Sequence, residues 1–148
     1  MSGPKLAAIL RRSHYQLKRF ASDLDSQARP YQIVSRSALG PTWQYGDDPD
    51  PVRYHDGQCV ELADGRTLVV ELQVLFDQDC VTVDGRLSVE FDETEDPGDG
   101  GVVGLLVDAG PRWARTDEEA IEAISETVRE ISSRPSLLED LGVLVREA

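Results

Sequence analysis

The feature that most constrains the fold is the alternation of apolar and polar residues between positions 59 and 91. This run holds two Asp-Gly pairs, at 64–65 and 84–85, and each is flanked by short segments with the period-two pattern of strands. Around the first pair, a three-residue loop that ends at Gly65 puts the apolar residues of both flanks on one face, whereas a two-residue loop separates them. The pattern therefore predicts a three-residue hairpin loop with Gly65 in the left-handed region of backbone space.

The second Asp-Gly pair predicts a hairpin of the same kind around Gly85. Even-numbered residues from Leu68 to Phe76 point inward, but Val81 points inward with odd parity, so the chain must turn or bulge at residues 77–79. We therefore predict a four-stranded antiparallel meander over residues 58–108. Its buried face is expected to carry Leu68, Val70, Leu72, Val81, Leu87, Val89 and Phe91.

Two amphipathic helices flank the meander. Residues 1–26 predict a basic helix from about Pro4 to Leu24, because its apolar residues share one face at 100° per residue. These residues are Leu6, Ile9, Leu10, Leu17, Phe20 and Leu24. The segment 116–142 predicts C-terminal helices that open with the capping box Thr116-Asp-Glu-Glu119. Its apolar face is formed by Ile121, Ile124, Val128 and Ile131.

Two more strands complete the predicted sheet. Tyr31 to Ala38 is typical of a strand, and Val102 to Val107 is so apolar that we expect it in the centre of the sheet, ending at Gly110-Pro111. Helices flanking consecutive hairpins predict the α+β class, with an antiparallel sheet of about five or six strands and both helices packed on one face. The length of 148 residues is that of a single domain, 1–148.

Residues 41–57 differ in composition from the rest of the chain and are rich in Pro, Asp and aromatic residues. We predict a loop here, and a loop of this length is usually functional. Its ring-bearing residues are candidates for a binding patch or for a lid over a pocket, and the alternative is that they cap the open end of the sheet. These candidate binding residues are Trp43, Tyr45, Tyr54 and His55.

The formal net charge is −13, from 15 Lys and Arg against 28 Asp and Glu. This charge argues against nucleic acid or an anionic membrane as the main partner. The charges are also segregated: residues 1–36 hold seven basic and two acidic residues, net +5, which leaves eight against 26, net −18, for residues 37–148. The basic helix can therefore pair with the acidic body, form a homodimer or engage an external target, and internal or dimeric pairing is favoured. Its contact set is Arg11, Arg12, Tyr15, Lys18 and Arg19.

A stripe of glutamates runs along the C-terminal helix on the face opposite the isoleucines. Each like-charge pair at i, i+4 costs about 0.2 to 0.5 kcal/mol, so the stripe either awaits a basic partner or is a solvated face of an acidic protein. The stripe consists of Glu118, Glu122, Glu126 and Glu130.

Evidence for catalysis or metal binding is weak. His55, Asp56 and Cys59 lie close in sequence, and with Cys80 they would allow a thiolate–imidazole pair or a three-ligand zinc site, but small buried cysteines and a surface histidine are the favoured interpretation. His14 is assigned to packing, at the edge of the apolar face of the first helix. We predict no catalytic residues, no metal and no cofactor.

The acidic segment after residue 91 suggests a calcium loop only superficially. Counted from Asp92, the sixth position is Pro97 where such a loop needs Gly, and the twelfth is Val103 where it needs Glu. A solvated loop is therefore expected. Its acidic residues are Asp92, Glu93, Glu95, Asp96 and Asp99.

No apolar stretch approaches the length of a membrane span, and two cysteines do not make a disulfide scaffold, so a cytoplasmic location is expected. The sequence favours a non-enzymatic acidic protein-binding domain, such as an adaptor, a chaperone or an immunity or antitoxin type of inhibitor, acting on a basic protein. The alternative is a small-molecule-binding domain or minor enzyme, with a pocket between sheet and helices that the 41–57 loop closes.

Overall fold

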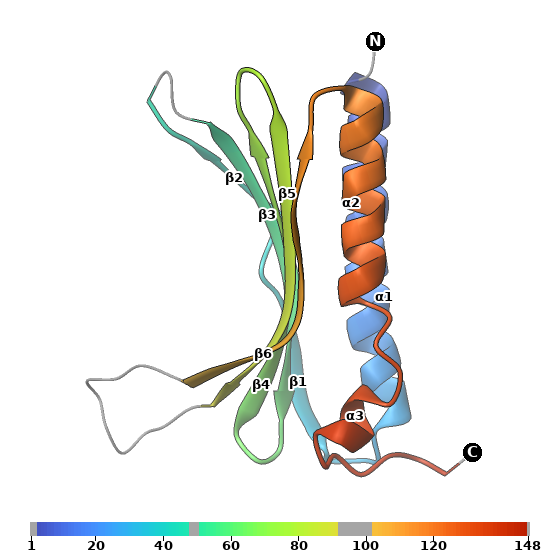
Figure 1. Ribbon diagram of the computed structural model, residues 1–148. Coiled ribbons are helices and arrows are strands. Elements are labelled where there is room, and N and C mark those ends of the chain that lie inside the picture. The colour runs from blue at the N-terminus through green and yellow to red at the C-terminus, as the bar shows by residue number, and fades with distance from the viewer. Residues whose placement is uncertain (1–2, 48–50, 92–101, 148) are drawn as a thin grey trace.

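The computed structural model describes residues 3–47, 51–91 and 102–147, which form two layers (Figure 1). One layer is a six-stranded antiparallel sheet, and the other consists of α1 and α2, packed side by side on a single face of that sheet. This confirms the predicted α+β class. The strands are β1 Ile33–Ala38, β2 Thr42–Tyr45, β3 Val52–Leu62, β4 Arg66–Phe76, β5 Val81–Phe91 and β6 Val102–Ala114. The helices are α1 Gly3–Gln27, α2 Asp117–Ile131 and the short α3 Leu137–Asp140.

The strand order is β1-β3-β4-β5-β6, and β2 also pairs with β3, beyond the end of β1. Strands β3 to β6 form an antiparallel meander, but the four strands predicted within residues 59–91 are three, β3, β4 and β5, and the fourth strand of the meander is β6. The β3–β4 loop has three residues, and Gly65 within it has φ +93°, as predicted. Its N–H donates a hydrogen bond to the Leu62 carbonyl at 3.1 Å.

The hairpin predicted around Gly85 is wrong, because β5 runs unbroken through that position. The chain turns instead at residues 77–80, where the Asp77 N–H donates to the Cys80 carbonyl at 3.0 Å. This is where the change of parity requires a turn. Gly85 serves the packing of the two layers, because a methyl group at this position would lie 2.6 Å from Cγ2 of Thr127. The glycine therefore makes room for α2 to approach the sheet.

The prediction for the last strand is wrong in two respects. β6 lies at the edge of the sheet and not at its centre, and it continues past Gly110-Pro111 to Ala114. The pairing of β5 with β6 shifts register between Val83 and Gly85, opposite this dipeptide. An irregular edge strand tolerates proline, because a bulge does not need the ladder hydrogen bond that proline cannot donate.

The loop predicted over residues 41–57 is also wrong, because β2 and the first half of β3 pair within it. Thr42 lies opposite His55, and Tyr45 lies opposite Val52. Five of the seven Pro and Asp residues in the segment fall within residues 47–51, between the two strands. The Pro and Asp residues therefore belong mainly to the connection between β2 and β3, whereas the aromatic residues on either side of it lie in strands, in line with their propensity.

The core lies between the sheet and the inner faces of the helices. The Thr116 side chain caps α2 by accepting a hydrogen bond from the Glu119 N–H at 3.2 Å, as the capping box predicts. The buried apolar residues of α1 include the predicted Ile9, Leu10, Leu17 and Leu24. The sheet contributes Leu68, Val70, Leu72, Leu87 and Val89, as predicted. Of the other two residues of the predicted buried face, Val81 is partly buried, and Phe91 is 37% exposed, so its predicted burial is wrong. None of the helices in the described part of the chain is both long and apolar enough to cross a membrane.

Candidate functional site

The face of the sheet opposite α1 and α2 is the candidate functional site, and we call it the open face. In Figure 1 the sheet bows, and the ends of its strands curve away from the helices, so the open face is concave. No helix of the described residues packs on it. Since strand residues alternate between faces, the odd-numbered residues of β3 and β4 and the even-numbered residues of β5 belong to the open face.

The charge of the open face is acidic. The described strands place five carboxylates on it, namely Glu61, Glu71, Asp84, Glu90 and Asp108. Against these stand two arginines and one histidine, namely Arg53, Arg86 and His55. Within the described residues only Glu71 forms an ion pair, with its Oε1 3.1 Å from Nε2 of His55. A concave surface of one charge sign focuses the electrostatic potential, so this face attracts cationic groups.

A polar hollow lies at the centre of the open face. Its volume is about 20 Å³, and it is lined by His55, Glu71, Gln73, Asp84, Gly85 and Arg86. Oδ1 of Asp84, one of these lining residues, is buried and has no hydrogen-bond partner among the described residues. A buried carboxylate oxygen without a donor is costly in free energy.

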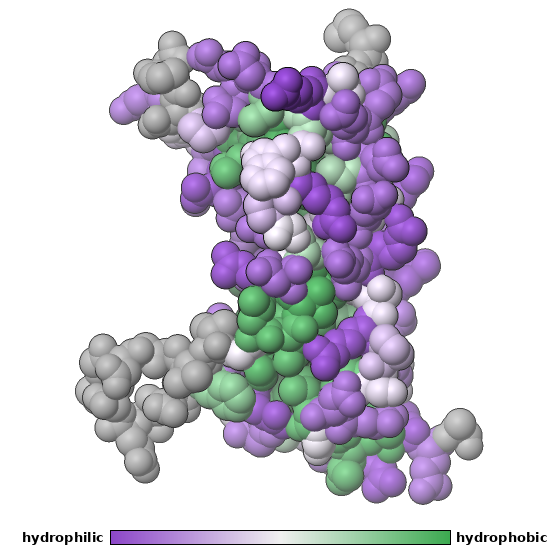
Figure 2. Space-filling model, in the orientation of Figure 1, coloured by the Kyte–Doolittle hydropathy of each residue, from purple (hydrophilic) through white to green (hydrophobic). Residues whose placement is uncertain are grey.

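An apolar edge adjoins the open face along β6. Leu105 is 52% exposed and Trp113 is 68% exposed, and both lie on the strand that has no neighbour at that edge among the described strands. Figure 2 shows an apolar region over the edge of the sheet where β6 runs. Exposed edge strands and exposed aromatic side chains are both features of surfaces that bind other chains.

The predicted aromatic patch does not form as one unit. The structure brings Trp43 and Tyr54 together, with ring centroids 4.9 Å apart in an edge-to-face arrangement, and Trp43 stacks on Phe76. These rings lie on the helix side of the sheet, whereas His55 lies on the open face. Tyr45 is exposed and lines a different groove, so the predicted lid over a common pocket is wrong.

Tyr54 is the buried member of the pair that it forms with Trp43. Its hydroxyl donates to Oδ2 of Asp56 at 3.4 Å. Burial raises the pKa of the Tyr54 phenol well above its ordinary value, and the neighbouring Asp56 charge and hydrogen bond raise it further. Tyr54 therefore acts as a hydrogen-bond donor inside the fold and is not available as a surface binding residue.

The two cysteines do not come together with His55. Cys59 lies seven residues along β3 from Val52, and Val52 pairs with Phe76, which adjoins the turn that holds Cys80. At a rise of 3.3 Å per residue along the strand, the two thiols are therefore about 23 Å apart. Burial, then Glu90 and Glu71, raise the pKa of the Cys59 thiol, which a hydrogen bond with Ser37 only partly offsets. In the described ranges no three His, Cys, Asp or Glu residues are placed to hold a metal ion. The acidic segment 92–101 lies outside the described residues.

The acidic stripe on α2 is partly used within the fold. Arg112 of β6 binds Glu130 at 3.0 Å and approaches Glu126 at 3.7 Å, so these two glutamates have a cation of their own. Glu118 and Glu122 are exposed and form no ion pair within the described part of the chain. Only the first half of the stripe is therefore free for a partner.

All five residues of the basic contact set on α1 are exposed. A groove beside it is lined by Arg12, Tyr15, Gln16 and Arg19. None of Arg11, Arg12, Lys18 and Arg19 forms an ion pair with a carboxylate of the described residues. The predicted pairing of the helix with the acidic body of the same chain is therefore not formed by these side chains, and the predicted homodimer stays a prediction.

Two functional features were missed by reasoning from sequence. The first is the open face, for which the odd-numbered polar residues of β3 and β4 were the available signal. The second is His14, which was assigned to packing but pairs with Asp56, 42 residues away, at 2.9 Å. No local pattern reveals that pair, because it depends on how α1 is placed over β3.

Comparisons with known proteins do not supply a family. No family model matches the sequence, and no curated protein and no solved structure matches it at a significant level. Function is therefore inferred from the geometry and chemistry of the chain's own residues.

Proposed function

We propose that this chain is a non-enzymatic protein-binding domain that takes a basic partner protein on its acidic open face. An adaptor, a chaperone and an immunity or antitoxin type of inhibitor all work in this way. The observation that carries the proposal is the concave sheet face with five carboxylates, of which one has an ion-pair partner within the described residues. The solvated carboxylates of this set cost little in the free protein, and a partner's Lys and Arg side chains pair with them on binding.

The geometry supports a protein partner in two further ways. The strands of the open face are held in register by ladders on both sides, so binding orders few backbone groups and loses little entropy. The exposed Leu105 and Trp113 at the β6 edge add apolar contact area beside the charged surface. A stable interface combines such apolar anchors with a polar rim over about 800 Å² on each partner.

The test compares two double variants with the same change in charge. Asp84→Asn/Asp108→Asn alters the open face, and Glu118→Gln/Glu122→Gln alters the free half of the stripe on α2. Proteins captured by the wild-type chain at low salt are purified, and their affinity for each variant is measured by calorimetry across a salt series.

We expect the open-face variant to bind about tenfold more weakly and with a shallower salt dependence, because desolvated charge pairs are lost, while the α2 variant stays within about twofold of wild type. Equal weakening by the two variants would assign the binding to diffuse charge and not to the open face. Failure to capture any protein at low salt would remove the basis of the proposal.

A further inference from the structure

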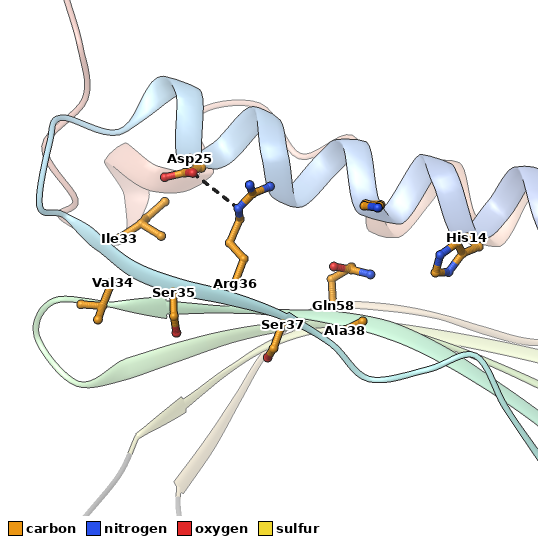
Figure 3. Close-up of a pocket in the computed structure, with 10 residues that line it drawn as sticks. His14, Asp25, Ile33, Val34, Ser35, Arg36, Ser37, Ala38 and Gln58 are labelled. Atoms are coloured by element: carbon orange, nitrogen blue, oxygen red, sulfur yellow. Dashed lines mark ion pairs between the residues drawn. The ribbon is translucent and has the colours of Figure 1, made fainter.

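A groove of about 450 Å³ lies on the helix side of the sheet, between α1 and the strands β1 and β3 (Figure 3). Its polar lining includes His14, Lys18 and Asp25 from α1, Arg36 from β1 and Gln58 from β3. In Figure 3 the side chains of Arg36 and Gln58 rise from the strands toward the helix, while Ser35 and Ser37 point away from it. The groove lies on the opposite side of the sheet from the open face.

The floor of the groove carries the side-chain amide of Gln58. The residue is only 6% exposed, and its side chain rises from β3 toward α1 in Figure 3. Gln58 lines the groove, so its amide can reach a ligand bound there. The amide NH₂ group offers such a ligand two hydrogen-bond donors.

The end of the groove is formed by His14. Its Nδ1 lies 2.9 Å from Oδ2 of Asp56, a carboxylate with 0% exposure whose other oxygen accepts from the Gly57 N–H. A carboxylate only accepts hydrogen bonds, so Nδ1 carries the hydrogen, and the ring is held in one orientation. The His14 side chain is 24% exposed, and Nε2 is the ring nitrogen that the contact with Asp56 leaves for the groove.

Two cations line the groove between its ends. Lys18 lies one helical turn after His14, and Arg36 faces α1 from β1. Nε of Arg36 is 3.4 Å from Oδ2 of Asp25, which leaves the terminal nitrogens of the guanidinium with no ion pair in the described part of the chain. Gln58, Lys18 and Arg36 thus present donors to one space, in a chain whose net charge is −13.

We propose that this groove binds a small organic anion through a carboxylate or phosphate group. The oxyanion would accept hydrogen bonds from Gln58, Lys18 and Arg36, with His14 at one end. A volume of about 450 Å³ exceeds what a bare ion fills and lies within the range of small-molecule sites, and Ile33 offers an apolar wall for the rest of the ligand. This site is independent of the protein-binding function proposed for the open face.

The test uses the fact that the chain has only two lysines, Lys5 and Lys18. Lys18→Gln removes a donor from the groove, and Lys5→Gln makes the same change in charge on the same helix outside it. Gln58→Leu removes the amide from the floor of the groove. Inorganic phosphate, phenyl phosphate, acetate and benzoate are titrated at an ionic strength held constant with chloride, with NMR of the Gln58 side-chain amide and calorimetry as readouts.

We expect saturable binding of at least one probe, weakened about tenfold by Lys18→Gln and by Gln58→Leu and left within about twofold by Lys5→Gln. Binding of the phosphates alone identifies a phosphorylated ligand, and binding of the carboxylates alone identifies an organic acid. No saturation with any of the four probes, or equal weakening by Lys5→Gln, overturns the proposal. Lys18 is exposed, so its variant decides the matter even where Gln58→Leu unfolds the chain.

Discussion

Replacing Gly85 by alanine tests how α2 is seated on the sheet. The added methyl group would lie 2.6 Å from Cγ2 of Thr127 and 3.2 Å from two carbons of Ile131, and both of these side chains are fully buried. Overpacking of this kind costs about 1 to 3 kcal/mol, and the lower chain entropy of alanine in the unfolded state returns about 0.4 to 1 kcal/mol. We expect Gly85→Ala to lower the free energy of unfolding by about 1 to 2 kcal/mol in urea titrations followed by circular dichroism.

A second substitution separates this steric mechanism from a general effect of losing glycine. Thr127→Ser removes Cγ2 but keeps the hydroxyl that accepts from Arg112 at 3.0 Å, and alone it should cost about 1 kcal/mol. In the double variant the clash is relieved, so the loss should fall short of the sum of the single losses by about 1 kcal/mol. Gly65→Ala is the control, because φ +93° makes it strained although nothing lies within 4 Å, and Thr127→Ser should not rescue it. Strict additivity of Gly85→Ala and Thr127→Ser would refute the account.

Three further predictions concern other parts of the molecule. Arg112→Ala should lower the free energy of unfolding by about 1 to 2 kcal/mol, because it leaves the buried Thr127 hydroxyl without its donor. The control is Arg115→Ala, which changes an exposed arginine and should alter the free energy of unfolding by less than about 0.5 kcal/mol in the same urea titration. In a Cys80→Ser variant, the raised pKa of Cys59 keeps its thiolate fraction at pH 8 below that of the unfolded chain. Iodoacetamide should therefore label Cys59 more slowly in the folded protein than in the unfolded chain. The difference in labelling rate should disappear as the pH rises past the raised pKa. A homodimer held by the basic face of α1 should dissociate as salt is added in light scattering, and a mass that does not depend on salt would contradict it.

The sequence Asp-Gly-Arg occurs twice, at 64–66 and 84–86, and the comparison shows what local patterns can predict. Both copies carry the turn signal, and both have the same buried parity on their flanks, but only Gly65 has a positive φ in a loop. Gly85 is in an extended strand because α2 needs the space above it, and α2 begins 32 residues later. Local periodicity therefore predicted which residues are buried, but it did not predict which glycine lies in a turn.

The same distinction between local pattern and tertiary packing applies to the candidate sites. The helix faces and the buried sheet face were predictable because each depends on the period of a single element. The His14–Asp56 pair and the groove that Gln58 lines depend on how α1 is placed over β3, and the unpaired carboxylates of the open face depend on neighbouring strands. The ion pairs of Arg112 with Glu126 and Glu130 could not be predicted from the sequence either, because the alternation of faces within β6 is interrupted near Gly110-Pro111.

Strand β3 carries residues of both proposed sites, and this sets how they can influence each other. Its even-numbered residues Asp56 and Gln58 lie on the helix side of the sheet, where Gln58 lines the groove, while its odd-numbered residues His55 and Glu61 lie on the open face. β3 is paired on both sides, with β4 along one side and with β1 and β2 along the other, and a shift of one residue would bring buried apolar groups to the open face. The register of the strand is therefore fixed, and an anion bound in the groove leaves the arrangement of the open-face carboxylates unchanged. We expect the affinity for a basic partner to be the same within about twofold in the wild-type chain and in Lys18→Gln, with and without saturating anion, once the ionic strength is matched. A tenfold change would mean that β3 moves on ligand binding, and the two surfaces would then have to be treated as one coupled site.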